Sequence, residues 1–430
     1  MSVAPQKESS QARSDARRPR ASLFFFDGYI SISPSVLGAA LELQARGYDV
    51  DLFYNSPPIE VLPPQLADGI VLHEHVPWTR AILGAIMNRL RRKKLRELSA
   101  IKADDTVRRK NARLRALAKA FVAFIEIPQF ALYCRRHVKP TDIAIAFDMN
   151  SLAAMDFAIP KAVPFAYWSL EIMMLADAPD PFTRWMKRHE LHRLEQARAV
   201  VVQSPVRRAL LEEDLKAPLS RYVEVPNAPS QPIPADLRRD FYSNLFPIPS
   251  GARIVLHSGF ISTSLMSLEI AQTAPAWPRD FVLVFHERQQ RNPQEPYLQA
   301  VQRAGADRVF LSLNPVPFDE VDTVYAGADI GLVCYQTAEL NEATAWASSG
   351  KLVYYLRHGL PIVVVMPQKP PILADWACGV WTPNVEGIGA ALTEIAADYD
   401  TYSQCARDAY NALFNFSTAF DHLMIAATST

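Results

Sequence analysis

The sequence has few cysteines, few glycines and no long apolar run. Its 430 residues include four cysteines and 15 glycines. The cysteines stand far apart without a Cys-x-x-Cys pair, which excludes zinc ribbons and thioredoxin-like motifs and fits a reducing compartment. Scarce glycine excludes collagen-like and glycine-rich proteins. Because the chain holds no uncharged apolar stretch of about 18 residues, we expect no transmembrane helix.

The chain also lacks an excess of either charge. Lys and Arg number 45, and so do Asp and Glu, which argues against a nucleic-acid-binding protein. Hydrophobic residues make up 49%, the composition of a globular protein of about two to three domains. Residues 1–20 contain basic residues but no apolar core, so we expect a disordered tail rather than a secretory signal. These features predict a cytoplasmic protein.

Short apolar runs, each followed by a turn or a helical pattern, recur in two parts of the chain and predict parallel strands. They lie at residues 22–26, 49–54, 142–147, 163–168, 199–203 and 222–225, and then at 253–257, 281–285, 309–311, 330–333 and 361–365. We therefore predict an α/β fold of two open parallel-sheet domains, residues 21–227 and 251–401, joined by a proline-rich linker over 228–250. The helical residues 402–430 are expected to cross back onto the first domain. Ligands of such sheets bind at the carboxyl ends of the strands, here in a cleft between the domains.

The segment with the sharpest pattern is 347–364. A Ser/Gly turn opens a helix with Lys351 in its first turn, Gly359 ends the helix, and Pro361 begins a buried strand. Backbone N–H groups at a helix start, together with a lysine, form an anion site. An ordinary helix start is the alternative.

This segment resembles the donor-site helix of GT-B glycosyltransferases, in the large retaining, nucleotide-sugar-dependent group (glycosyltransferase family 4-like). The matching residues are Ser348, Lys351, Leu352, Tyr355, Leu356, Gly359 and Pro361. Residues 318–332 resemble the region before that helix, and 199–204 with Arg207 resemble the last strand of the first domain. The resemblance covers about 22–425. It implies two Rossmann-like domains, the first for the acceptor and the second for the donor.

The resemblance further implies a hexosyltransferase-type enzyme. Such an enzyme moves a sugar, with retention, from a nucleotide-diphosphate sugar to a glycan, glycolipid or natural-product acceptor, and it requires no cofactor or metal. We expect Lys351 to stabilise the donor phosphates and residues 312–317 to meet the base. The expected donor contacts are Gly259, Ser262, Ser264, His286, Leu313, Asn314, Ser348, Ser349, Gly350, Lys351, Leu352 and Tyr354.

The sequence departs from the family pattern at three places. The glutamate expected three residues after Lys351 is Tyr354, and its partner eight residues earlier is Trp346. The loop over 259–264 has hydroxyl groups where the family often has cations. These departures keep two alternatives open: a non-catalytic GT-B-like partner subunit of a transferase, and a sugar-nucleotide epimerase.

In the first domain, polar residues follow predicted strands, where functional residues of α/β sheets lie. Asp148 and Glu171 are candidate catalytic residues beside Lys351, and Asp148 can act as a base or simply cap the next helix. Gly28, Ser33 and Asn150 are candidate acceptor-side residues.

A basic insert interrupts the first domain at about 80–125. Residues 84–120 contain 13 Lys or Arg and three Asp or Glu, and apolar residues recur there at helical spacing. Two interpretations stay open. The insert is either an amphipathic surface for a membrane, which suits a lipid-linked acceptor and a peripheral location on the inner membrane face, or a solvated helical hairpin covering the sheet. Few aromatic residues interleave with its charges, so we expect no nucleic-acid partner.

Overall fold

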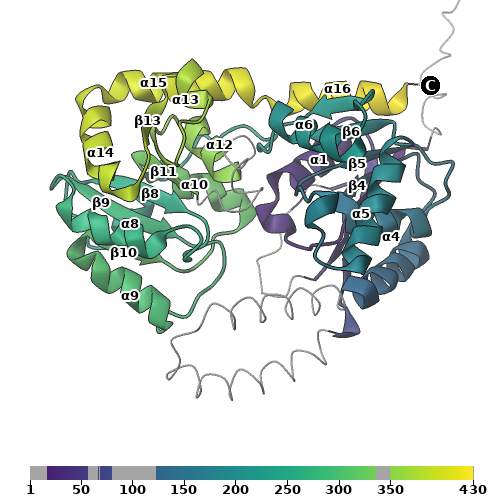
Figure 1. The fold of residues 1–430 in the computed structure, drawn as a ribbon, viewed down its shortest axis with the longest axis horizontal. Coiled ribbons are helices and arrows are strands. Elements are labelled where there is room, and N and C mark those ends of the chain that lie inside the picture. Colours follow the sequence, from purple (N-terminus) through teal and green to yellow (C-terminus); the bar gives the residue numbers. More distant parts are fainter. Residues whose placement is uncertain (1–16, 57–65, 67, 80–122, 336–348, 430) are drawn as a thin grey trace, which may run out of the picture.

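A computed structural model describes residues 17–56, 66, 68–79, 123–335 and 349–429. The chain forms two lobes, each built around one parallel sheet (Figure 1). Two C-terminal helices, α15 (Tyr399–Leu413) and α16 (Phe416–Thr428), run along one side and join the lobes. The fold is therefore the two-domain GT-B arrangement predicted from the sequence, with a C-terminal helix that crosses back.

The first sheet has seven parallel strands in the order β3-β2-β1-β4-β5-β6-β7. Their bounds are β1 (Arg20–Phe25), β2 (Asp49–Asn55), β3 (Ile70–His75), β4 (Ile143–Phe147), β5 (Phe165–Trp168), β6 (Ala199–Val202) and β7 (Tyr222–Glu224). The helices of this lobe are η1 (Ile30–Ile32), α1 (Pro34–Ala45), residues 123–137, α4 (Asp148–Ala158), η2 (Leu175–Asp177), α5 (Pro181–Leu194) and α6 (Pro205–Leu215). The strand order reverses between β1 and β4, so the loops after these two strands part and leave a crevice.

The second sheet has six parallel strands in the order β10-β9-β8-β11-β12-β13. Their bounds are β8 (Arg253–Ser258), β9 (Phe281–His286), β10 (Val309–Ser312), β11 (Ile330–Cys334), β12 (Ile362–Val365) and β13 (Gly379–Thr382). The helices that follow the linker are α7 (Phe241–Leu245), α8 (Ser267–Thr273), η3 (Ala274–Ala276), α9 (Pro296–Ala304), η4 (Ala306–Arg308), η5 (Phe318–Glu320), α10 (Val321–Ala326), α12 (Gly350–Arg357), α13 (Ile372–Asp375), η7 (Val385–Gly387) and α14 (Ile388–Ala397). Here the order reverses between β8 and β11.

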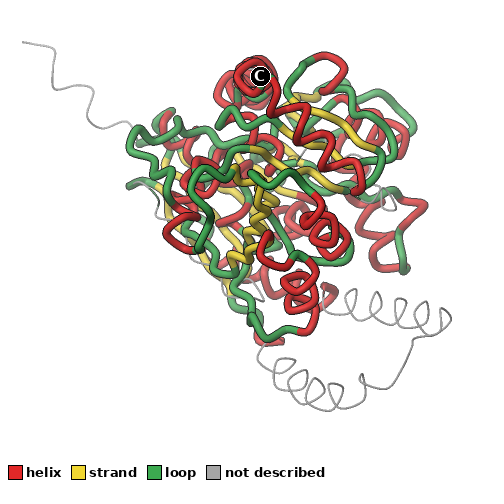
Figure 2. The backbone as a smooth tube through the Cα atoms, turned by 90° about the vertical axis from the view of Figure 1, so that its left-hand side faces the viewer, coloured by secondary structure: helices red, strands yellow, loops and turns green. Residues whose placement is uncertain are grey.

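Both sheets are covered by helices on their two faces, which explains why the strands are continuous apolar runs rather than alternating ones. All five residues of β4 and all six of β9 are buried. Figure 2 shows the strands enclosed by helices when the molecule is seen from the side of the second lobe. One hydrophobic cluster fills one face of each sheet, and a third, larger cluster runs from the first lobe into the second.

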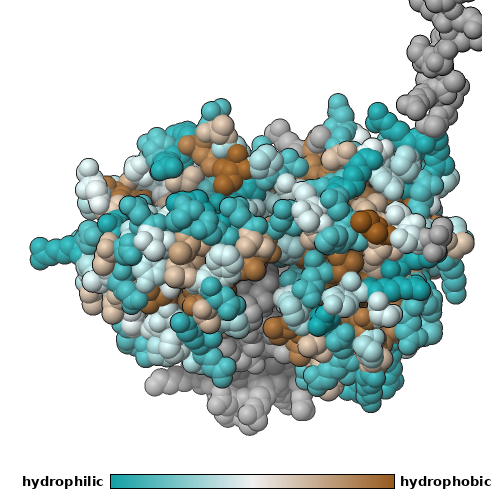
Figure 3. Space-filling model, turned by 90° about the horizontal axis from the view of Figure 1, so that it is seen from above, coloured by the Kyte–Doolittle hydropathy of each residue, from teal (hydrophilic) through white to brown (hydrophobic). Residues whose placement is uncertain are grey.

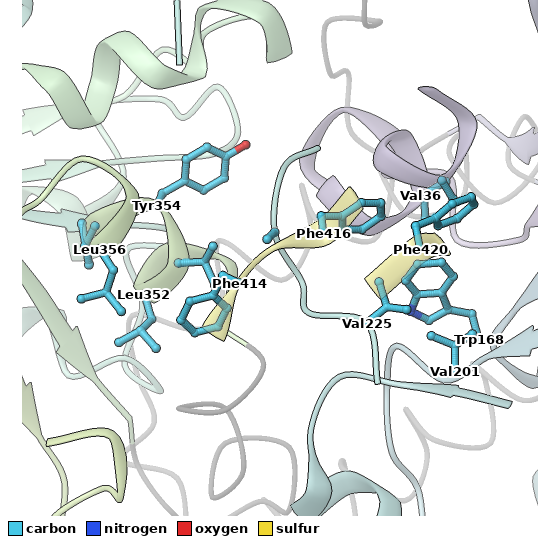
Figure 4. Packing of buried hydrophobic residues seen from close by; sticks show 14 of the residues in the cluster. Val36, Trp168, Val201, Val225, Leu352, Tyr354, Leu356, Phe414, Phe416 and Phe420 are labelled. Carbon is cyan, nitrogen blue, oxygen red and sulfur yellow. The ribbon is translucent and has the colours of Figure 1, made fainter. Parts of the chain in front are cut away.

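The C-terminal helices carry the core across the gap between the lobes. Phe414 lies beside Leu352 of the second lobe, whereas Phe416 stacks on Trp168 of the first lobe with ring centroids 6.1 Å apart (Figure 4). Phe416 also covers Gly38 of α1, where an added Cβ would lie 2.7 Å from its Cζ atom. Burial of these aromatic rings ties the two domains together.

The predicted strands agree with the structure except at two edges. Strands β3 and β13 were not among the predicted ones, because no residue of β3 and only the last residue of β13 is buried, so neither stands out as a buried apolar run. Residues 1–16 of the expected tail and 80–122 of the basic insert lie outside the described residues. In the part of the chain that the structure describes, no helix is long and apolar enough to span a membrane. The face that carries α15 and α16 is mostly hydrophilic, with scattered hydrophobic residues (Figure 3).

Candidate functional site

The loops at the two points of strand reversal face each other across the gap between the lobes. In the second lobe, β8 ends next to Gly259, whose φ of +126° only glycine adopts readily. An added Cβ at Gly259 would lie 3.7 Å from Nζ of Lys351, on α12. The strand end and the helix start that the sequence predicted as a donor site therefore lie together.

The start of α12 is built as predicted. Ser349 is the N-cap, and its Oγ accepts a hydrogen bond from Leu352 N. The hydroxyl of Tyr335, just after β11, donates to the same Oγ at 2.6 Å. The N–H groups of Gly350 and Lys351 come before Leu352 and have no acceptor within the helix. Together with the positive end of the helix dipole, they form an anion-binding corner.

Tyr355 fixes α12 against the sheet. Its ring lies over Gly331 of β11, where an added Cβ would come within 2.3 Å of the ring. Its hydroxyl donates to Leu256 O at 2.8 Å and accepts from Ser258 N at 2.9 Å. Because these bonds join α12 to β8, the anion-binding corner is held on rigid elements.

A cavity of about 660 Å³, open to solvent, lies beside the start of α12. Apolar side chains of 315–324 form one wall, and Tyr325 and Tyr354 form another. These two rings stack with centroids 4.7 Å apart and planes 9° apart. At Tyr354, where the sequence resemblance predicted a glutamate, the structure has a buried ring, and burial raises the pKa of its phenol.

A cation that the sequence analysis did not select stands in this cavity. Arg288 follows β9 by two residues, and its Nη2 lies 3.9 Å from the position of an added Cβ at Gly350. Nδ2 of Asn227, the last residue before the linker, lies 3.6 Å from the same position. Arg288, like His286, stands at the end of β9, and this position after a strand is the sequence signal that indicates it. The loop over 259–264 lacks a cation, but Arg288 brings one to the same corner.

His286, a predicted donor contact, lines this cavity as a neutral side chain. Its Nδ1 is 2.9 Å from Ser312 Oγ, and burial, with the positive charge of Arg288, lowers its pKa to about 4. His257 is fully buried on the other face of β8, and burial lowers its pKa well below 6.5. Neither imidazole carries a charge at neutral pH.

A second cavity, of about 1030 Å³ and open to solvent, continues the first into the other lobe. Its walls come from both lobes, and Arg288 and Asn227 line both cavities. The first lobe contributes Ser33, the predicted acceptor-side residue, and three carboxylates. These are Asp27, Asp148 and Glu171.

The three carboxylates differ in their partners. Oδ1 of Asp148 accepts hydrogen bonds from Leu170 N at 2.7 Å and Glu171 N at 3.1 Å. Asp148 is therefore not an N-cap but the first residue of α4, in a left-handed conformation with φ of +61°. Burial raises the pKa of all three carboxyl groups, and neighbouring negative charges raise those of Asp148 and Glu171 further. The Arg207 guanidinium attracts Glu171 and counteracts its shift.

Other predicted site residues lie elsewhere. Oγ of Ser262 is 2.9 Å from Oγ of Ser264 in a partly exposed loop outside the two cavities. Leu313 lines a separate cavity beside α9, whereas Pro315 and Val316, within the segment predicted to meet the base, line the first cavity. Asn314 and Asn150 are not among the lining residues of the two cavities.

Of the remaining residues that the sequence analysis singled out, two help to form the fold and two lie outside the described residues. Gly28 is buried, with φ of +80°, and turns the chain after β1. Leu352 packs in the core. Ser348 and Trp346 lie outside the described residues. Among the described residues, no group of three His, Cys, Asp or Glu is arranged to hold a metal ion.

The sequence matches no protein-family model and no curated protein. Solved structures resemble it over almost their whole length. Sucrose-phosphate synthase from Thermosynechococcus elongatus is 15% identical with a TM-score of 0.60, covering 95% of this chain and 97% of that one. WaaG, a glycosyltransferase involved in lipopolysaccharide biosynthesis, is 14% identical with a TM-score of 0.56, covering 95% and 100%.

An Escherichia coli trehalose-6-phosphate protein bound with UDP-2-fluoro glucose is 11% identical. Its TM-score is 0.56, and the match covers 95% of this chain and 99% of that one. At such identities the likeness concerns the fold. This chain has the two-domain GT-B fold found in these proteins.

Proposed function

We propose that the protein is a glycosyltransferase that moves a sugar from a nucleotide-diphosphate sugar to a hydroxyl-bearing acceptor. The observation that carries this proposal is the anion-binding corner at the start of α12. There Nζ of the buried Lys351 lies beside Gly259, and Nη2 of Arg288 lies beside Gly350 in the cavity at the start of α12. The GT-B fold supports it, because solved structures of this fold include glycosyltransferases.

The corner suits a leaving diphosphate. When the bond from the sugar to the diphosphate breaks, negative charge develops on the phosphate oxygens. Lys351, Arg288 and the N–H groups at the start of α12 are fixed donors that stabilise this charge. The apolar wall of 315–324 and the Tyr325–Tyr354 pair then offer a surface for the nucleoside. Two of the expected donor contacts, Ser262 and Ser264, are left without a role in this arrangement.

The geometry favours a transferase over the two alternatives. An epimerase needs an acid and a base beside the donor sugar, whereas Asp27, Asp148 and Glu171 stand on the first lobe in the second cavity. Glu287, which lines the donor cavity, is fully buried. Its Oε2 accepts hydrogen bonds from Ile261 N and Arg291 Nη1, both at 3.0 Å. A non-catalytic subunit needs no polar cavity beside the anion-binding corner. In this protein the second cavity, of about 1030 Å³, continues from the first one at that corner. This second cavity is the proposed acceptor site.

Nucleotide binding tests the proposal. We would titrate UDP, GDP, ADP and TDP, and their common sugar conjugates, into the wild type, Lys351→Met and Arg288→Gln by calorimetry. One nucleotide class should bind the wild type, and each substitution should weaken it about tenfold or more, since hydrogen bonds to charged groups contribute about 1.5–3 kcal/mol. Lys161→Met, at an exposed turn, is the matched control and should bind normally. A folded wild type that binds none of these ligands would identify a non-catalytic subunit.

We also propose that the acceptor is reached at an anionic membrane surface. Phe124 packs edge-on against Phe182, which stacks on Trp185, and both Phe124 and Trp185 are 58% exposed. Exposed aromatic side chains of this kind are common at membrane interfaces. Phe124, Phe182 and Trp185 thus form an aromatic patch, and we propose that this patch contacts the headgroup region of the bilayer.

The position of the basic insert supports the same partner. Thr79 Oγ1 donates to Glu126 Oε1 at 2.7 Å, so the chain leaves and re-enters the described structure at one place, next to this aromatic patch. The intervening residues 84–120 contain 13 Lys or Arg against three Asp or Glu. Each basic residue near an anionic bilayer contributes about 1 kcal/mol of attraction.

A further inference from the structure

A further large cavity lies at the opposite end of the second sheet from the anion-binding corner. Its volume is about 1630 Å³, and it is open to solvent. Residues at the amino ends of β8, β11 and β12, the carboxyl end of α12 and α15 form its walls together with linker residues between 233 and 250, and we call it the linker cavity. Because substrates of parallel sheets bind at the carboxyl ends of the strands, the linker cavity is separate from the proposed donor and acceptor sites.

The charged side chains that line the linker cavity are mostly arginines. Arg239, Arg357 and Arg407 line it, against one carboxylate, that of Asp329. Oδ2 of Asp329 accepts a hydrogen bond from Ile254 N at 2.7 Å, so part of this carboxylate is used by the backbone. A concave surface with an excess of one charge concentrates ligands of the other charge. The linker cavity therefore attracts anions.

The glycine that ends α12 makes room for Arg407. Gly359 has φ of +66°, and an added Cβ there would collide with Nη1 of Arg407. Ser403 Oγ donates to Gly359 O at 2.7 Å and accepts from Nη1 of Arg407 at 3.0 Å. The Nε and Nη2 atoms of Arg407 donate to the neutral amide of Gln404 at 3.3 and 3.2 Å. These partners hold the guanidinium over the end of α12 without neutralising it.

Arg357 contributes a buried cation to the same wall. The residue is 4% exposed, its Nη2 donates to Asp322 Oδ2 at 3.1 Å, and the hydroxyl of Tyr410 lies beside the guanidinium. Within the described residues, its Nε and Nη1 atoms are buried without a hydrogen-bond partner. Buried donors of this kind cost free energy until an acceptor reaches them. In a residue that lines a cavity, they point to a ligand that carries acceptor oxygens.

The positive charges gather around one ring of α15. Burial, with the charge of Asp329, raises the pKa of Tyr399 to about 12, while the nearby guanidinium groups of Arg253, Arg407 and Arg239 oppose this shift. The Tyr399 hydroxyl donates to Asp329 O at 2.9 Å, which fixes the ring at the cavity wall. Arginines from the linker, from β8 and from α15 thus meet at one place.

Cations at the carboxyl end of a helix also offset its dipole, and Arg357 stands at that end of α12. This role does not account for Arg239, which comes from the linker, or for the two unpartnered nitrogens of Arg357. A ligand accounts for both.

We propose that the linker cavity binds a small molecule through its phosphate monoester group. Such a group carries up to two negative charges and three terminal oxygens, so it can accept hydrogen bonds from several guanidinium groups at once. Ser243 and Ser250, with the apolar side chains of Ile233 and Leu237, line the rest of the cavity and suit a hydroxylated body such as a sugar. This inference does not depend on the proposed function.

Calorimetric titration of the full chain tests the inference, with ribose 5-phosphate, inorganic phosphate and ribose as probes. Ribose 5-phosphate should bind, and ribose should not. Arg407→Gln and Arg239→Gln should each weaken the binding of ribose 5-phosphate about tenfold, because each removes a charged donor to the phosphate. Both side chains are exposed, so these variants should fold as the wild type does.

Two control variants separate the linker cavity from the rest of the surface. Arg279→Gln changes an exposed arginine before β9 that does not line the linker cavity. Arg288→Gln removes the cation that lines both the proposed donor and acceptor cavities. Both variants should bind ribose 5-phosphate with the affinity of the wild type.

The two phosphate compounds distinguish the source of the phosphate group. Tighter binding of ribose 5-phosphate would support a phosphorylated small molecule, and equal binding would support the phosphate group as the part that is recognised. Binding that Arg288→Gln abolishes and Arg407→Gln leaves intact would overturn the inference, as would a folded wild type that binds neither compound. These results leave the nucleotide titration, which tests the proposed function, unaffected.

Discussion

The ammonium of Lys351 lies 3.7 Å from the position that a Cβ on Gly259 would take. This closeness joins a helix start and a strand end that are far apart in the chain. The backbone at 259 favours glycine because φ is +126°. The donor corner therefore depends on a glycine as much as on the lysine.

Gly259→Ala should weaken nucleotide binding as well as stability. The φ of +126° makes alanine unfavourable by about 1–3 kcal/mol, and its methyl group would contact Lys351. Gly251→Ala is a matched control, with φ of +79° and no atom within 4 Å of the added Cβ. Urea unfolding should show a loss of stability in both variants, and calorimetry should show weaker nucleotide binding only in Gly259→Ala. Equal binding by both would separate Gly259 from the donor site.

Gly38→Ala should destabilise the crossing of α16 onto the first lobe. The new methyl group would lie 2.7 Å from Cζ of Phe416, which must move, and overpacking of this kind costs about 1–3 kcal/mol. Gly389→Ala, inside α14, meets only Trp277 at 3.5 Å and should gain up to about 1 kcal/mol from helix propensity. We therefore expect the urea midpoint to fall in Gly38→Ala and to rise in Gly389→Ala. A stabilising Gly38→Ala would contradict the packing described for Phe416.

His286 should make stability fall as the pH drops below about 6.5. Its pKa is about 4 in the folded protein, below the 6.5 of the unfolded chain, so the unfolded state binds the proton first. The stabilisation is full above pH 6.5 and is lost progressively between pH 6.5 and 4, a total of about 3 kcal/mol.

His286→Asn removes this titration while keeping a polar side chain beside Ser312. Unfolding by urea at several pH values should therefore give the variant a flatter profile between pH 4 and 6.5 than the wild type. Parallel profiles for the two proteins would show that His286 does not titrate in this way.

Trp185→Ser should reduce binding to anionic vesicles about tenfold, since burial of the exposed indole ring in the bilayer would contribute more than about 1.4 kcal/mol. Flotation with phosphatidylglycerol vesicles at several salt concentrations measures it, with phosphatidylcholine vesicles as the neutral comparison. Ile425→Ser on α16 is the control, because Ile425 is 64% exposed but lies on the other side of the first sheet from α5. Unchanged binding by Trp185→Ser, or a preference for RNA over vesicles, would contradict a membrane-docking role for the aromatic patch.

The sequence by itself determined most of the architecture. Continuous apolar runs predicted the buried parallel strands, because a strand covered on both faces needs apolar residues at every position. The Ser/Gly turn before Lys351 and the glycine at 359 predicted α12, because capping is local chemistry. The same local reasoning missed β3 and β13, of whose residues only Thr382 is buried.

Only the tertiary structure decided which side chains meet at the site. Arg288 and Asp27 follow strand ends, as many residues do, and nothing local distinguishes them from Ser262 or Asn150. Their importance arises because the strand order reverses between β8 and β11 and between β1 and β4, which opens a crevice at those places. The partners of Asp148 lie 22 and 23 residues away, so its role in holding a loop depends on long-range packing.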